Sequence, residues 1–117
     1  FNTLDNNWRY EDFFFEELMP HVEEKYRIRK EKRFRAISGL SMGGGGTFMY
    51  ALHRPDLFSS AAPLSAYVGP LDLDQFKRQA ERMNYNGPME DLENYFKRHN
   101  AISLIEDGDV ASMKTVR

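Results

Sequence analysis

The feature that most constrains this chain is a serine placed between two glycines. Residues 39–43 are Gly-Leu-Ser-Met-Gly, with Ser41 at the centre. The preceding stretch FRAIS, residues 34–38, is short and apolar at alternate positions, which predicts a buried strand. Residues 42–53 carry apolar side chains at helical spacing and stop at Arg-Pro-Asp, which predicts a helix. The serine therefore lies at a predicted strand-to-helix turn.

The chemistry of such a turn gives each of its residues a predicted role. A serine on a very sharp turn stands clear of the sheet, and glycines two before and two after it let strand and helix approach. Gly39 and Gly43 occupy those positions. The first amides of a helix have no partner within it, so the Met42 N–H can face the oxygen of an attacked carbonyl. We predict Ser41 as a nucleophile and Met42 as an oxyanion-hole donor.

The rest of the chain predicts an α/β fold in one domain. Residues 59–68, SSAAPLSAYV, predict a second strand, and strand, helix and strand at this spacing form a parallel crossover unit. Residues 10–26 have apolar side chains at three-and-four spacing, which predicts an amphipathic helix that Pro20 kinks or restarts. Residues 72–103 are polar, mostly helical in pattern and broken at Tyr-Asn-Gly-Pro, so we expect a cap or insertion there.

Composition excludes several classes of function. The chain has 117 residues and a net charge of −2, which offers no electrostatic attraction to nucleic acid or to anionic membranes. No apolar run approaches the roughly 20 residues that cross a bilayer, and no export signal is visible. The absence of cysteine leaves cytoplasmic, periplasmic and secreted locations open. Acidic residues and histidines show no ligand spacing along the sequence, so we expect neither a metal nor a cofactor.

The glycines that follow the turn allow a second interpretation. Gly44, Gly45 and Gly46 each cost about 1 kcal/mol relative to alanine inside a helix, so close packing against neighbouring strands should offset them. A glycine-rich helix start can also bind phosphate. The sequence departs from both nucleotide-binding patterns. The P-loop requires Lys and then Ser or Thr after its second glycine, but Gly44 is followed by Gly45 and Gly46, and the dinucleotide fingerprint requires a third glycine where Phe48 or Met49 stands. Nucleotide binding is the minor alternative.

Two stretches, YEDFFFEELMPHVEEKYRI and AISGLSMGGGGTFMYALHRPDLFSSAAPLSA, resemble the "putative esterase" family of the α/β-hydrolases. This family includes esterase D, feruloyl and acetyl xylan esterases and the mycolyltransferases. The resemblance runs from about Trp8 to about Tyr67 and implies a three-layer α/β-hydrolase fold, of which residues 1–117 form a part. It also implies a serine esterase that forms an acyl-enzyme on Ser41. The substrate would be a small-molecule or polysaccharide-linked ester, with feruloyl or acetyl esters of plant cell walls as the nearest subfamily.

The resemblance implies further residues that we do not find in the sequence. Family members carry serine, acid and histidine in that order, in a domain of roughly twice this length. The acid and histidine of the triad are therefore expected after Arg117, and the second oxyanion donor before Phe1. Without them, residues 1–117 alone should be inactive or nearly so. A noncatalytic α/β binding module or pseudoenzyme, in which Ser41 only tolerates a tight turn, remains the alternative.

The three histidines of the chain are predicted to lie away from the serine. His21 precedes the turn on the amphipathic helix. His53 ends the following helix, about 18 Å from Ser41 at 1.5 Å per residue. His99 is expected to be a solvated residue at a helix end. The sequence does not indicate an oligomeric state.

Overall fold

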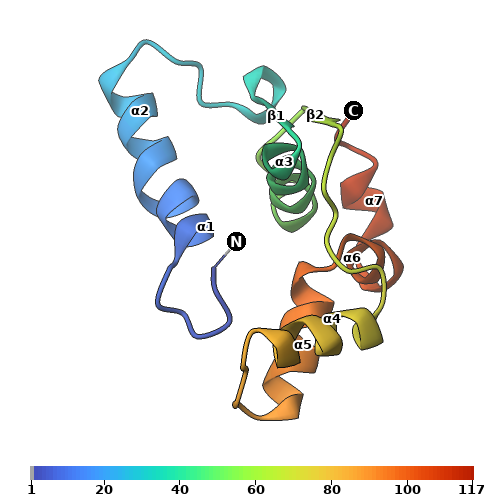
Figure 1. Ribbon diagram of the computed structural model, residues 1–117. Coiled ribbons are helices and arrows are strands. Elements are labelled where there is room, and N and C mark those ends of the chain that lie inside the picture. Colours follow the sequence, from blue (N-terminus) through green and yellow to red (C-terminus); the bar gives the residue numbers. More distant parts are fainter. Residues whose placement is uncertain (1) are drawn as a thin grey trace.

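The computed structural model describes residues 2–117 and shows a small two-stranded parallel sheet, the helix α3 (Met42–His53) packed on one of its faces, and further helices on either side of α3 (Figure 1). The strands are β1 (Ala36–Leu40) and β2 (Ser60–Leu64), and the helical segments are α1 (Tyr10–Asp12), η1 (Phe13–Leu18), α2 (Met19–Lys25), η2 (Lys32–Phe34), α3 (Met42–His53), α4 (Leu73–Arg82), α5 (Met89–His99), α6 (Ala101–Asp107) and α7 (Val110–Met113). Within residues 2–117, none of the helices combines the length and apolar character needed to cross a membrane.

The predicted strand, helix and strand are confirmed as a parallel crossover unit. β1 and β2 pair in parallel with register Ala36↔Ser60 to Leu40↔Leu64, and α3 connects them over the predicted range. β1 begins two residues later than predicted because residues 32–34 form a 3-10 turn. β2 is shorter than predicted because Ser65 has a φ of 42°, which ends the extended backbone.

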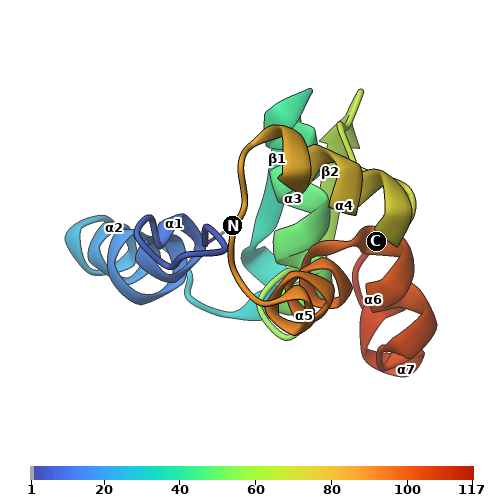
Figure 2. The same ribbon diagram turned by 60° about the horizontal axis from the view of Figure 1, so that its bottom comes forward.

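The sheet is covered by α3 on one face. A Cβ added at Gly39 would point into α3, and side chains alternate along a strand, so Leu40 points to the opposite face. Leu40 and its register partner Leu64 are 67% and 54% exposed there. Residues 2–117 thus form two of the three layers that the sequence led us to expect. Figures 1 and 2 show the N-terminal helix and helices α6 and α7 on opposite sides of α3.

The N-terminal helix runs continuously through α1, η1 and α2. Its hydrogen-bonding pattern changes next to Pro20, where we predicted a kink or a restart. Residues 13–18 form a π-helix, in which the Met19 amide donates to the Phe14 carbonyl, and α-helical bonding resumes in the segment that contains Pro20. Phe14 and Phe15 contact Tyr50 of α3, with ring centroids 4.9 and 5.1 Å apart. These aromatic contacts fix the helix against α3.

A paired arginine joins this helix to the sheet. Arg35, at the start of β1, donates from Nε and Nη2 to both carboxylate oxygens of Glu23, at 2.6 and 2.9 Å. Their side chains are only 15% and 10% exposed. Hydrogen bonds from Arg35 outweigh the opposing effect of burial, so the pKa of Glu23 lies below its ordinary value. The pair therefore stabilises the fold when Glu23 is ionised.

We expect Glu23→Gln to lower the free energy of unfolding by about 1–3 kcal/mol at neutral pH, because two charge-assisted hydrogen bonds are lost. A carboxyl whose pKa is lower in the folded state stabilises above its unfolded pKa, and this stabilisation disappears as the pH falls through the folded value. The difference between parent and variant should therefore shrink in acid. Urea denaturation at several pH values measures it. Glu31→Gln, which breaks only the exposed pair with Arg33, should cost less than about 1 kcal/mol.

Candidate active site

Ser41 lies between β1 and α3 in a backbone conformation that serine rarely adopts. Its φ is 55° and its ψ is −112°, and the residue is exposed. Such a backbone costs about 1–3 kcal/mol and persists only where the surrounding structure holds it. The strand therefore turns into the helix within one residue, and the hydroxyl is left at the surface of the molecule.

Three backbone hydrogen bonds hold Ser41 in this conformation. Its amide donates to the Leu64 carbonyl at 2.9 Å, which ties the turn to the end of β2. Its carbonyl accepts from the Gly45 amide in α3 and from the Tyr67 amide, both at 3.0 Å. Strand, helix and the segment after β2 thus all bond to one residue, which explains how the strained backbone is kept.

The two glycines of the turn differ in what they contribute. A Cβ at Gly39 would lie 2.3 Å from the carbonyl oxygen and 2.4 Å from the carbonyl carbon of Gly43, so only glycine fits there. A Cβ at Gly43 would meet no heavy atom of residues 2–117 within 4 Å. The steric reason that we predicted for both glycines thus applies to Gly39. At Gly43 it does not apply, because the backbone carbonyl of Gly43 approaches Gly39 and a side chain on Gly43 would have room.

The following glycines let α3 pack closely on the segment after β2. A Cβ at Gly44 would lie 2.6 Å from the Leu64 carbonyl oxygen, and one at Gly45 would lie 2.1 Å from the Tyr67 carbonyl oxygen. The predicted close packing is confirmed at these two positions. Gly46 has open space around an added Cβ. Packing therefore explains two of the three glycines without a bound phosphate.

The Met42 amide is the first N–H of α3. The first hydrogen bond inside the helix is donated by Gly45 to Ser41, so the amides before it have no acceptor in the helix. The side chain of Met42 is 81% exposed. An oxygen carrying negative charge beside Ser41 would meet this helix end, where the backbone dipoles favour an anion.

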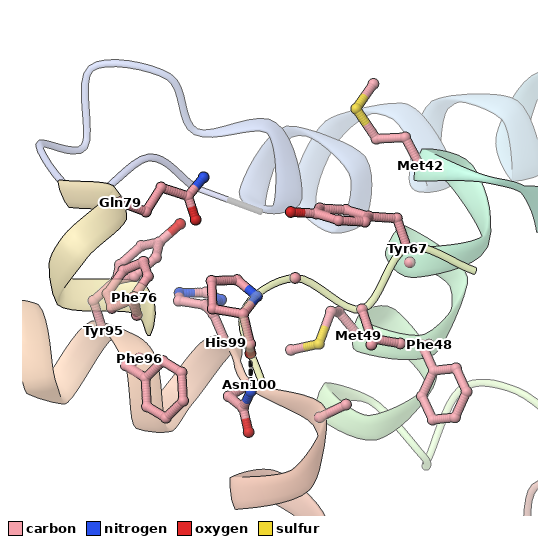
Figure 3. Close-up of a pocket in the computed structure, with 15 residues that line it drawn as sticks. Met42, Phe48, Met49, Tyr67, Phe76, Gln79, Tyr95, Phe96, His99 and Asn100 are labelled. Carbon is pink, nitrogen blue, oxygen red and sulfur yellow. Dashed lines mark hydrogen bonds between the residues drawn. The ribbon is translucent and has the colours of Figure 1, made fainter. Parts of the chain in front are cut away.

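A pocket of about 240 Å³ starts at Met42 and extends between α3 and the helices α4 and α5 (Figure 3). Its walls are mainly apolar, and the side chains of Tyr67 and Gln79 reach toward one another across it. The ring-bearing residues that line it are Phe48, Tyr67, Phe76, Tyr95, Phe96 and His99. The pocket thus lies beside the serine turn and is rich in aromatic surface.

Tyr95 and His99 are the titratable groups in the inner wall of this pocket. Burial raises the pKa of Tyr95, whose hydroxyl donates to the Asn2 carbonyl at 2.8 Å. Burial, and then the neighbouring His53, lower the pKa of His99 to about 4. Both side chains are therefore neutral at physiological pH. His99 ends α5, as predicted, but it is packed against Tyr95 with ring centroids 4.2 Å apart and is not the solvated residue that we expected.

His53 ends α3, about 18 Å along the helix from Ser41, and the ring of His99 lies 5.4 Å from that of His53. His21 is exposed on α2. His53 pairs with the carboxylate of Glu11, and its Nε2 lies 2.6 Å from the Arg98 carbonyl. Burial by itself lowers the pKa of His53, but the hydrogen bonds with Glu11 and Arg98 reverse this, and the net shift is upward. Within residues 2–117, we therefore find no histidine positioned to take the proton of Ser41.

The structure brings together one group that the sequence did not suggest. Ligand atoms of Glu11, His53 and His99 all lie within 4.8 Å of one another. These residues come from α1, the end of α3 and the end of α5. No local spacing signals the group, because it forms only when three separate helices pack together.

Comparisons with known proteins show which family this chain resembles. The family model described as "Putative esterase" matches residues 2–113. Two esterases of Mycobacterium tuberculosis are 39% identical over 67 residues, which is 57% of this chain and 14% of each relative. An endo-1,4-beta-xylanase/feruloyl esterase of Xylanibacter ruminicola is 37% identical over 49 residues, 42% of this chain and 7% of that protein. The chain thus spans a small part of these curated relatives.

Two solved structures resemble most of the described arrangement. A ferulic acid esterase superposes with a TM-score of 0.68 and 28% identity, over 93% of this chain and 39% of its own. The S-formylglutathione hydrolase of Staphylococcus aureus gives a TM-score of 0.58 and 28% identity, over 84% of this chain and 34% of its own.

Proposed function

This chain belongs to the "putative esterase" family and forms part of an α/β-hydrolase fold, and on that premise we propose that it carries the nucleophile of a serine esterase, Ser41. The observation that supports this proposal most is the backbone of Ser41, exposed at a one-residue turn with a φ of 55°. Strain of this kind is typical of functional residues. Ser65, which follows the last residue of β2, also has a positive φ, but Ser41 turns a strand directly into a helix and lies beside the free amides at the start of α3.

In the proposed reaction, the Ser41 oxygen attacks the ester carbonyl and loses its proton to a base. The negative charge that develops on the carbonyl oxygen is stabilised by the Met42 amide at the start of α3. The alcohol then leaves with a proton, and water hydrolyses the acyl-enzyme on Ser41. The chain spans 39% of the ferulic acid esterase it resembles, and we place the histidine base, its acid and the second oxyanion donor in the part it does not span.

A fluorophosphonate probe, which modifies activated serines, tests the proposal directly. The natural full-length protein should be labelled at Ser41, and Ser41→Ala should abolish the labelling. Ser65→Ala is the matched control, because Ser65 is also exposed and also has a positive φ, 42°. Absence of labelling in the unmodified full-length protein would favour the noncatalytic binding module.

We further propose that the pocket beside Ser41 binds the acyl group, and that an aromatic acyl group fits it better than acetyl. Its volume of about 240 Å³ and its aromatic walls support this. Residues 72–103 would act as the cap, because Phe76 and Phe96 from α4 and α5 form the wall opposite α3. A feruloyl ester, free or attached to a polysaccharide, has a suitable acyl group.

Tyr67→Ala should lower the ratio of kcat/KM for a feruloyl ester to that for an acetyl ester about tenfold, which corresponds to one lost ring contact of about 1.4 kcal/mol. Tyr67 is 63% exposed, so its removal should not unfold the protein. Tyr26→Ala is the control, since Tyr26 is 57% exposed and lies outside the pocket. An unchanged ratio in Tyr67→Ala would exclude the pocket as the acyl site.

A further inference from the structure

The group formed by Glu11, His53 and His99 has a chemical role that the proposed esterase reaction does not use. It lies at the end of α3 that is opposite to Ser41, and the 12-residue helix separates the two by about 18 Å. Its three members come from three helices that meet only in the folded chain. Such a group either holds the helices by hydrogen bonding alone or binds a ligand.

The carboxylate of Glu11 points to a ligand. Glu11 is only 9% exposed, and its Oε1 pairs with Nδ1 of His53. Its second oxygen, Oε2, is buried and has no hydrogen-bond partner among residues 2–117. A buried carboxylate oxygen without a partner is costly, and a bound cation removes that cost.

The orientation of His53 matches that of a metal-binding histidine. Its Nε2 lies 2.6 Å from the Arg98 carbonyl, and because a carbonyl can only accept, Nε2 carries a proton. With a metal ion bound, the ring is neutral and the Nδ1 lone pair, on the side of the Glu11 carboxylate, is available to the ion; without the ion, Nδ1 carries a proton and donates to that carboxylate. Histidines that bind metals usually donate their other N–H to a carbonyl or carboxylate in this way, which fixes the tautomer and the ring.

The third donor and the local electrostatics also favour a cation. His99 places a ring nitrogen within 4.8 Å of the other two ligand atoms, and its ring lies edge-on to that of His53. His53 and His99 are the last residues of α3 and α5, helices of 12 and 11 residues. The partial negative charges at two helix C-termini thus add to the charge of Glu11.

We propose that Glu11, His53 and His99 bind a divalent transition metal ion, of which Zn²⁺ fits best. Two neutral imidazoles and one carboxylate are a donor set that zinc commonly takes, and harder cations such as Mg²⁺ and Ca²⁺ prefer oxygen ligands alone. The ion joins the N-terminal helix, the helix α3 that follows Ser41 and the proposed cap helix α5. Its distance from Ser41 makes it a structural ion. The proposal is independent of the role of Ser41.

The natural full-length protein, without a polyhistidine tag and stripped with EDTA, tests this site. Calorimetric titration with Zn²⁺ should show one ion bound per chain at this site, and the Tm should rise with Zn²⁺. Glu11→Gln and His99→Gln should each weaken the affinity at least about 100-fold. His21→Gln, which removes the exposed histidine of α2, should leave it unchanged.

A second measurement keeps the test decisive if a variant folds poorly. Crystals of the unmodified protein grown with Zn²⁺ should show anomalous scattering at the zinc edge between the three side chains. Lack of stoichiometric binding, or equal affinity in Glu11→Gln and His99→Gln, would overturn the proposal and leave a plain Glu11–His53 ion pair. Labelling of Ser41 by a fluorophosphonate is a separate result, so failure of one proposal does not decide the other.

Discussion

Replacing Ser41 by alanine should lower kcat/KM for ester hydrolysis by at least about 10⁴-fold in the natural full-length protein. Alanine removes the oxygen that forms the acyl-enzyme, and loss of a catalytic serine removes covalent catalysis entirely. The residual rate would come from the oxyanion hole and substrate binding. Steady-state hydrolysis of a chromogenic acetyl ester measures the change.

The structure of the turn should survive this change. Ser41 is held by its backbone amide and carbonyl, which alanine retains, and the side chain is exposed. The Tm of Ser41→Ala should therefore stay close to that of the parent. Activity within tenfold of the parent, with an intact Tm, would show that Ser41 is not the nucleophile and would favour the binding module.

Gly45→Ala should destabilise the protein by at least about 2 kcal/mol. Its Cβ would lie 2.1 Å from the Tyr67 carbonyl oxygen, a backbone atom that can give way only if the segment after β2 moves. The same movement would pull the Tyr67 amide away from the Ser41 carbonyl and release the strained turn. We therefore expect activity to fall together with the midpoint of urea denaturation.

Gly46→Ala provides the matched control for this prediction. The two positions are adjacent in α3, but an added Cβ at Gly46 meets nothing within 4 Å among the described residues. Alanine there should stabilise the helix by up to about 1 kcal/mol, because glycine is the poorer helix former. If both variants lost stability equally, close packing of α3 would not be the reason for these glycines.

The sequence alone predicted the parts of the fold that depend on local order. The helix over residues 42–53 matches α3 because apolar spacing and the Arg-Pro-Asp stop are local signals. The parallel pairing of the strands follows from their spacing, since a crossover helix fits only that arrangement. The family was also recognised from contiguous residues around Ser41, and the "Putative esterase" match confirms it.

Other features of the site depend on contacts between residues far apart in the sequence, so only the tertiary structure decided them. Gly39 and Gly43 look alike in the sequence, yet only Gly39 faces the opposing backbone, because the direction of each Cα–Cβ bond follows from the packed turn. His99 looked like a solvated helix end, but the end of α5 meets the end of α3, which places His99 against His53 and Tyr95. The group of Glu11, His53 and His99 had no signal at all, since no spacing along a chain encodes where three separate helices converge.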